Sequence, residues 1–300
     1  MDLHACTLCP RACGADRTAG PGLCGAGELP RLARAALHRW EEPCVSGTRG
    51  SGAVFFSGCP LRCCFCQNRA ISSGNRGAEV SPERLEEIFL ELQDQGAHNL
   101  NLVSAGQYLP QVARVLGRVR GRLRIPVVYN TGGYERAEAL RQLDGLVDVY
   151  LPDFKFYDPA LAARYAAAPD YFPVAAAAIG EMLRQTGPVE LDEEGLIRRG
   201  VMVRHLVLPG GRGDSEQILR WMAGHLPLSD IRLSLMWQYT PDADSPHKEL
   251  RRRVATGEYR PLAELAAELG FQGYLQERSS ARESYTPAFD LEWVLRRASG

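Results

Sequence analysis

The sequence predicts an α/β protein, a partial (β/α)6 TIM-like barrel with a small Cys-rich metal-binding N-terminal segment. From Ala53 onward, short apolar runs alternate with amphipathic helical patterns, which is typical of a parallel sheet covered by helices. Polar residues stand where these runs stop, as expected at the carboxyl ends of barrel strands. Because 300 residues allow one large core and a small appendage, we expect the Cys-rich segment over residues 1–50 and the barrel domain over residues 51–300.

Six apolar runs are expected to form parallel strands, and six strand–helix units fit a partial barrel. We place the strands at Val54–Ser57, Asn99–Val103, Pro126–Asn130, Val147–Asp153, Met202–Leu208 and Arg232–Met236.

Two helices have local start signals. Ser81 followed by Pro82 provides an N-cap and a first-turn proline, and Asp214 with Ser215 precedes a second apolar helical face. We therefore expect one helix to begin at each of these two sites.

Two other segments are less regular. The Ala-rich stretch 160–185 is interrupted at Pro169 and Pro173, so it is expected to form two helices. Within the Cys-rich segment, a short helix is expected near Leu29–Trp40.

Composition excludes several classes of protein. A formal net charge of -1 gives no electrostatic reason to expect nucleic acid or an anionic membrane as a partner. The chain has no long apolar run and no signal-peptide pattern at its N-terminus, so we expect a cytoplasmic protein. In that reducing compartment, nine cysteines at metal-like spacings indicate clusters or zinc rather than disulfides.

Three cysteines carry the most specific signal. Cys59, Cys63 and Cys66 form a C-x3-C-x2-C triplet directly after an apolar run. Three thiolates can hold three irons of a 4Fe-4S cluster and leave the fourth iron free for a substrate, which favours catalysis over electron transfer. The alternatives are a zinc site or a set of buried thiols.

Four further cysteines lie near the N-terminus. Cys6, Cys9, Cys13 and Cys24 have the spacing C-x2-C-x3-C-x10-C, with glycines that permit sharp turns around a metal. Four thiolates close the coordination shell, so this site is expected to hold a structural zinc or a second iron-sulfur cluster. Either metal would fold a segment that is poor in apolar residues.

The remaining cysteines and histidines carry weaker signals. We expect Cys64 to be a small buried side chain and leave Cys44 open as core or spare ligand. His4 is expected to be solvated, with a role as metal ligand as the alternative. Because neighbouring residues of a strand point to opposite faces, His205 and Arg204 cannot both face the interior.

The cysteine triplet, with Phe65 before its last member, resembles the signature of the radical S-adenosylmethionine (SAM) superfamily. The resemblance implies a 4Fe-4S cluster whose open iron chelates the amino and carboxylate groups of SAM, with Phe65 beside the adenine. Reductive cleavage of SAM would then start hydrogen-atom abstraction from a substrate.

Other segments resemble the pyruvate formate-lyase activating enzyme branch, namely 130–134, 153–155 and 203–210. The chain is similar in particular to homologs of that activase that begin with C-x2-C-P-R-x-C-G-x-D-R, here residues 6–17. This resemblance implies an electron donor such as flavodoxin or ferredoxin, and a possible protein substrate, a glycyl radical enzyme.

The resemblance also assigns roles around SAM. Asp153 and Lys155 would meet its carboxylate and ribose side, and Arg204 would lie near the cofactor with His205 structural. Gln238 stands where the activase has a ribose-contacting histidine.

Two further strand ends complete the expected SAM site. Asn130 and Thr131 match a pair that helps to bind a monovalent cation beside SAM. The activase has a Gly-Gly-Glu motif after the second strand, whereas this chain has Ser104-Ala105-Gly106-Gln107, so we expect Ser104 and backbone carbonyls to hold SAM there.

Three functions therefore remain open. The first is an activase that modifies a glycyl radical enzyme. The second, favoured by the missing acid, is a radical SAM enzyme acting on a small molecule or another protein side chain. The third is a non-catalytic iron-sulfur electron carrier or zinc scaffold.

Overall fold

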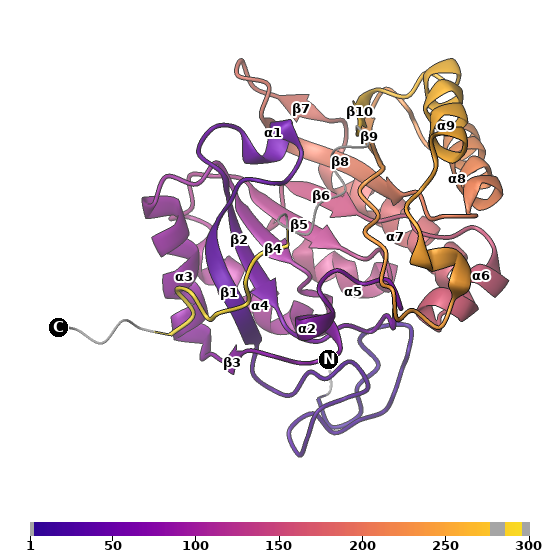
Figure 1. Cartoon of the computed structure of the whole chain (residues 1–300). Helices are drawn as coiled ribbons and strands as arrows, with labels where there is room; N and C mark the ends of the chain where they lie inside the picture. Colours follow the sequence, from indigo (N-terminus) through magenta and orange to yellow (C-terminus); the bar gives the residue numbers. More distant parts are fainter. Residues whose placement is uncertain (1–2, 277–285, 296–300) are drawn as a thin grey trace.

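The computed structural model of the chain describes residues 3–276 and 286–295. One sheet runs through it in the order β10-β9-β8-β6-β5-β4-β2-β1-β3 (Figure 1). Its two ends do not meet, so the sheet is an open partial barrel and the predicted fold class is confirmed. The six predicted strands lie side by side and parallel as β2 (Ser51–Phe56), β4 (Leu100–Val103), β5 (Val127–Thr131), β6 (Val149–Pro152), β8 (Ile197–Leu206) and β9 (Ile231–Met236).

Strand β8 begins five residues before its predicted start at Met202. The additional residues pair antiparallel with the short strand β7 (Glu190–Leu191), where Glu190 lies opposite Arg199. The hairpin with β7 extends the strand at Ile197 and Arg199, while Gly200 and Val201 pair with β6 in the parallel sheet.

The edges of the sheet are made by strands that the sequence did not predict. They are β1 (Arg31–His38), β3 (Ala78–Glu79) and β10 (Gly273–Leu275). The prediction of a short helix near Leu29–Trp40 is therefore wrong, because this segment forms β1. β1 pairs antiparallel with β2, and Leu32 and Ala35 are fully buried in the sheet. Pairing with distant segments overrides the helix propensity of the alanines in this strand.

Helices connect the strands and pack against the sheet, which places the apolar core between the two layers (Figure 1). They are α1 (Pro43–Ser46), α2 (Arg69–Ser72), α3 (Pro82–Asp94), α4 (Leu109–Val119), α5 (Ala137–Leu140), α6 (Pro159–Ala166), α7 (Tyr171–Thr186), α8 (Arg212–His225) and α9 (Thr256–Glu268). Three 3-10 turns lie at Gly106–Tyr108, Arg141–Leu143 and Lys248–Arg251. Within residues 3–276 and 286–295, none of the helices combines the length and the apolar character that crossing a bilayer requires.

The helix-start predictions have different outcomes. The Ser81 hydroxyl accepts a hydrogen bond from the Arg84 amide, so Ser81 caps α3 as predicted. The start predicted at Asp214 is wrong, because α8 already begins at Arg212. The Asp214 carboxylate instead accepts the backbone N–H groups of Tyr157 and Asp158, which fixes the loop before α6.

The stretch 160–185 forms two helices, α6 and α7, as predicted. Only Pro169 lies in the break between them. Pro173 lies in the first turn of α7, where a missing N–H costs no hydrogen bond.

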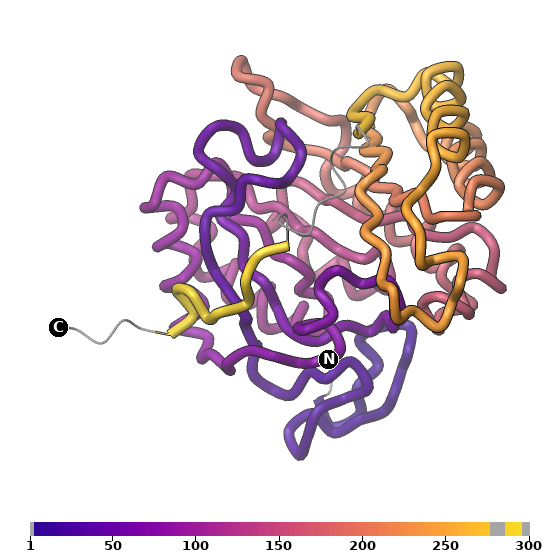
Figure 2. Tube along the Cα trace, in the orientation of Figure 1, coloured from indigo at the N-terminus to yellow at the C-terminus, as the bar shows by residue number. Residues whose placement is uncertain are grey.

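Residues 286–295 pack against β1, the first strand of the chain. Figure 2 shows residues 286–295 crossing β1 and β2. The Leu291 N–H donates to the Ala33 carbonyl, and the Ala35 N–H donates to the Glu292 carbonyl, each at 2.9 Å. The Phe289 ring packs edge-on against Phe55, so this segment covers the open side of β1.

Candidate functional site

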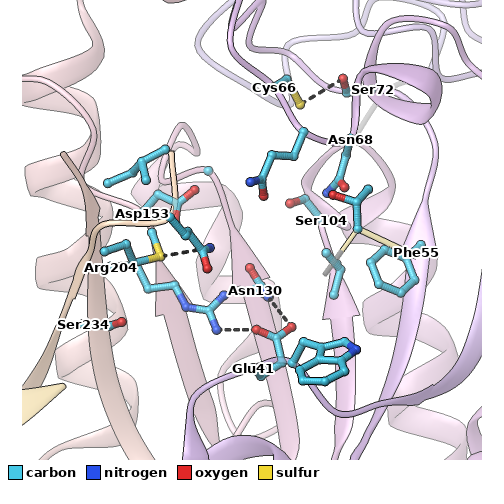
Figure 3. Close-up of a pocket in the computed structure, with 18 of the residues that line it drawn as sticks. Glu41, Phe55, Cys66, Asn68, Ser72, Ser104, Asn130, Asp153, Arg204 and Ser234 are labelled. Carbon is cyan, nitrogen blue, oxygen red and sulfur yellow. Dashed lines mark hydrogen bonds and ion pairs between the residues drawn. The ribbon is translucent and has the colours of Figure 1, made fainter. Parts of the chain in front are cut away.

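One cavity of about 600 Å³ opens at the carboxyl ends of the parallel strands. Figure 3 shows side chains from β2, β4, β5, β6 and β8 facing it from several sides. The predicted residues that line this main cavity are Cys59, Cys63, Phe65, Cys66, Ser104, Asn130, Asp153, Lys155, Arg204 and Gln238. Thr131 does not line it. Its buried hydroxyl donates to the Glu135 carboxylate behind the cavity wall.

The three-cysteine loop (residues 58–66) follows β2 directly and is held by backbone hydrogen bonds. The Cys59 N–H donates to the Cys24 carbonyl at 2.9 Å, and the Cys64 N–H donates to the Tyr165 carbonyl at 2.8 Å. The Cys66 Sγ lies 3.3 Å from the Ser72 hydroxyl (Figure 3). Cys64 is half-buried rather than buried, which corrects the sequence expectation.

The thiols of this loop lie in an apolar, crowded environment. Burial raises the pKa of Cys63 to about 12, although Lys155 acts in the opposite direction. Burial, followed by the nearby Cys63 and Cys66, raises the pKa of Cys59 well above its usual range. Thiolates at these positions therefore need a metal or cluster to offset their charge.

Across the cavity, Lys155 forms a half-buried ion pair with Asp153. Burial alone would lower the pKa of Lys155, but Asp153 and the neighbouring cysteines hold it above its usual value. The ammonium group therefore remains charged close to the three-cysteine loop.

Arg204 is paired with two acids that the sequence analysis missed. Its guanidinium forms ion pairs with Glu41 and Glu42, which lie between β1 and α1. Glu41 also accepts hydrogen bonds from the side-chain amides of Asn101 at 3.1 Å and Asn130 at 3.4 Å (Figure 3). Two consecutive acids after Trp40 are the only sequence signal for this network.

His205 points away from the cavity. One ring nitrogen lies 2.6 Å from the Phe154 carbonyl and the other 2.8 Å from the Ser215 hydroxyl. Arg204 lines the cavity and His205 does not, as expected for neighbouring residues of one strand.

The family model for the radical SAM superfamily matches residues 53–222, more than half of the chain. The chain belongs to the radical SAM superfamily. Membership implies an enzyme with a 4Fe-4S cluster and SAM. A relative that is 28% identical over 271 residues, 87% of this chain and 74% of its own, is an uncharacterized protein of Methanocaldococcus jannaschii.

Two solved structures share the fold of this radical SAM protein. Methylornithine synthase has a TM-score of 0.51 and 16% identity, and the match covers 83% of this chain and 64% of that one. SuiB of Streptococcus suis, bound to S-adenosylmethionine, has a TM-score of 0.50 and 11% identity, covering 73% and 48%. The chain thus spans less than two thirds of each of these proteins, and such identities show the fold alone.

The turn after β4 departs from the activase motif, and its glutamine is structural in this radical SAM protein. The Gln107 side-chain amide donates to the carbonyls of Ser57 and Ser104, each at 3.0 Å. An acid nevertheless reaches this turn from the loop after β5, because a Cβ on Gly106 would lie 2.8 Å from Glu135 Oε1. Burial raises the pKa of Glu135 to about 7.

The four N-terminal cysteines gather at a second, small pocket. Cys6, Cys9, Cys13 and Cys24 line it together with Arg17 and Pro60. Backbone hydrogen bonds fold the segment tightly there, with the Cys6 N–H on the Ala15 carbonyl and the Gly14 N–H on the Cys6 carbonyl. This four-cysteine pocket adjoins the three-cysteine loop through Pro60.

In neither cysteine set are the described side chains arranged around one point as the ligands of a single metal ion. Among the residues described, no three His, Cys, Asp or Glu side chains stand together closely enough to hold one metal ion. A four-iron cluster imposes a different requirement, because it distributes its ligands over separate irons. The three-cysteine loop, with Lys155 facing it, fits such a cluster by donor type and by its position on the cavity.

The other predicted candidates lie outside both cysteine sets. Cys44 is buried in a separate apolar cluster with Val45 and Val128. His4 is exposed, and its ring lies 3.2 Å from the Asp16 carboxylate.

Proposed function

We propose that this chain binds SAM in the main cavity and cleaves it reductively at a 4Fe-4S cluster on Cys59, Cys63 and Cys66. The observation that carries the proposal is that these three cysteines and the polar ends of five parallel strands line one cavity of about 600 Å³. When bound and reduced, the cluster supplies one electron to the sulfonium of SAM, which starts hydrogen abstraction from the substrate.

The chain's own residues then bind and orient SAM. Lys155, charged and half-buried beside the three-cysteine loop, is positioned to pair with its carboxylate. Phe65 offers an apolar ring for the adenine, while Ser104 and Gln238 offer hydrogen bonds to the methionine amino group and the ribose. Asp153 keeps Lys155 in place.

Arg204 receives a different role from the one expected. Two carboxylates, Glu41 and Glu42, already pair with its single positive charge, so the group is net negative and would repel the SAM carboxylate. We propose that Arg204 orders the cavity wall, and that it orders Asn130 because both residues bind Glu41. The Thr131 hydroxyl is occupied by Glu135, which leaves Asn130 as the member of the expected cation-binding pair that faces the cavity.

The favoured substrate is a protein, as in activation of a glycyl radical enzyme. Supporting this choice, Trp40 and Leu275 at the cavity lining are 58% and 54% exposed, an apolar rim suited to a polypeptide. A small-molecule substrate is the second candidate, favoured by the absence of an acid directly after Gly106. A flavodoxin or ferredoxin is the proposed electron donor.

The proposal is tested by anaerobic reconstitution of the wild type and Cys59→Ala, followed by reduction with dithionite in the presence of SAM. We expect 5'-deoxyadenosine and methionine from the wild type alone. A matched control is Cys44→Ala, which removes a buried thiol outside both cysteine sets and should retain cleavage. Failure of the wild type to bind or cleave SAM despite a full cluster would contradict the proposal.

We also propose that Cys6, Cys9, Cys13 and Cys24 bind zinc or a second iron-sulfur cluster. Iron content of the reconstituted wild type decides between them, with about four irons for one cluster and about eight for two. Zinc analysis of the same sample completes the comparison.

A further inference from the structure

The four-cysteine segment (residues 3–30) holds the three-cysteine loop at three successive points. The Cys24 carbonyl accepts the Cys59 N–H at 2.9 Å, and the Pro60 carbonyl accepts Arg11 Nε at 2.9 Å. The Leu23 carbonyl accepts the Arg62 guanidinium. Figure 1 shows the N-terminal loops beside the end of the molecule that carries α2, directly after the three-cysteine loop.

The two segments also pack closely enough to restrict residue type. Gly58 has φ +88°, and a Cβ on it would lie 2.6 Å from the Cys24 carbonyl oxygen. On the other side, the Asn75 amide donates to the Gly25 carbonyl at 3.1 Å. A shift of Cys24 or its neighbours would therefore move the backbone that carries Cys59.

Arg17 is a buried cation at the pocket that the four cysteines line. Its side chain is 2% exposed, lines the pocket with the four cysteines and donates twice to the Gly27 carbonyl. Its guanidinium lies 5.5 Å from the centroid of the Tyr108 ring. Within the described part of the chain, no carboxylate forms an ion pair with it.

A buried cation without a counter-charge is costly. Four thiolates around a zinc ion, or around a 4Fe-4S cluster in its oxidised form, carry a net charge of about −2. Such a centre provides the anion that Arg17 lacks. An apolar set of protonated thiols would leave the guanidinium uncompensated.

We infer that the four-cysteine segment is a metal-closed clasp, with Arg17 as its buried counter-ion, that fixes the conformation of the three-cysteine loop. Through Cys24, Leu23 and Arg11, the state of the N-terminal metal would determine whether the main cavity can hold its cluster. The inference rests on the proposed function in taking the three-cysteine loop as the cluster site and the four N-terminal cysteines as metal ligands.

The first test removes the catalytic ligands, so that SAM chemistry does not enter. In the full chain with Cys59→Ser, Cys63→Ser and Cys66→Ser, zinc alone is added and removed with a chelator, and amide exchange of residues 57–66 is measured. Zinc should slow that exchange by about tenfold or more while leaving β5 unchanged. Adding Cys9→Ser and Cys13→Ser should abolish the effect.

Two results would overturn the clasp: one zinc per chain with unchanged exchange at residues 57–66, or no metal retained by the four cysteines after either zinc loading or iron reconstitution. If the triple variant does not fold, Cys13→Ser in the otherwise native chain serves instead. Its reconstituted cluster should lose iron to a chelator about tenfold faster than the wild type. An equal rate would overturn the inference.

Arg17 is tested separately. Arg17→Gln should speed chelator release of the N-terminal metal by about tenfold, corresponding to the loss of one partly buried charge interaction, and Arg17→Lys should restore much of the difference. Equal release from wild type and Arg17→Gln would remove Arg17 from the clasp. Because these tests measure exchange and metal retention, their failure is distinguishable from a failure of SAM cleavage.

Discussion

Arg204 on β8 and Glu42 before α1 form a buried bidentate ion pair across the wall of the main cavity, with Arg204 Nε 2.9 Å from Glu42 Oε1. The Arg204 charge holds the pKa of Glu42 below its usual value although burial acts to raise it. This ion pair therefore holds the segment between β1 and α1 against β8, which is not adjacent to β1 in the sheet.

Removing one partner of this pair should be strongly destabilising. Glu42→Gln leaves the Arg204 guanidinium buried without its main counter-charge, and we expect a loss of about 3 kcal/mol in the free energy of unfolding. Urea unfolding of anaerobically purified protein measures it. Glu79→Gln, which disrupts an exposed pair with Arg31, is the matched control and should change stability by less than about 1 kcal/mol. Equal effects of the two substitutions would argue against a structural role for the Arg204 pair.

Glu135 should make stability depend on pH in an unusual direction. Burial raises its pKa from 4.5 to about 7, so the folded state holds a proton that the unfolded state has released. The stability from this group is present below about pH 4.5 and is lost as pH rises to about 7, by an amount on the order of 3 kcal/mol. Glu135→Gln, which cannot ionise, should lack this loss.

Unfolding of the wild type and Glu135→Gln at pH 5 and pH 8 measures the difference. The wild type should lose more free energy of unfolding than Glu135→Gln between pH 5 and pH 8. Glu193→Gln in the exposed turn after β7 is the control and should follow the wild type at both values. Parallel curves for wild type and Glu135→Gln would exclude Glu135 as the titrating group.

Lys155 should contribute to SAM affinity. Lys155→Met removes a half-buried ammonium and leaves Asp153 without its partner, and we expect SAM binding to weaken by roughly ten- to a hundredfold. Titration of the reconstituted cluster with SAM, followed by its electron paramagnetic resonance signal, measures affinity without turnover. Lys248→Met at the exposed 3-10 turn should leave affinity unchanged. Unaltered SAM affinity in Lys155→Met would remove Lys155 from the SAM site.

Gly58 should tolerate no side chain. Gly58→Ala places a Cβ 2.6 Å from the Cys24 carbonyl at a positive φ, so the three-cysteine loop must move. We expect iron content after reconstitution to fall to less than about half of the wild-type value. Gly117→Ala, on α4 with open space at its Cβ, should retain full iron content. Normal iron loading of Gly58→Ala would show that the loop is not constrained at this position.

Local sequence signals predicted much of this architecture. The six parallel strands followed from hydrophobic runs, and the cysteine spacing is a local pattern that needs no knowledge of the fold. The polar strand ends were identified because parallel strands bring their carboxyl ends to one edge. Ten of the eleven residues proposed around the cluster and SAM line the main cavity, and Thr131 alone does not.

What the sequence did not predict depends on contacts between distant segments. β1 is a strand because β2, Leu291 and Glu292 pair with it, although its alanines favour a helix. Glu41 and Glu42 became part of the site only through Arg204, more than 160 positions away. Glu135 reaches Gly106 from the loop after β5, a contact that no local pattern indicates.

The pairing of Leu291 and Glu292 with β1 has a consequence for a chain that lacks these two residues. A chain that stops after β10 lacks Leu291 and Glu292, so the Ala33 carbonyl and the Ala35 N–H remain unpaired on an apolar sheet edge. Such an edge can recruit a strand from another molecule. Leu291 and Glu292 therefore cover this edge, and a chain cut before them should leave it accessible to proteases.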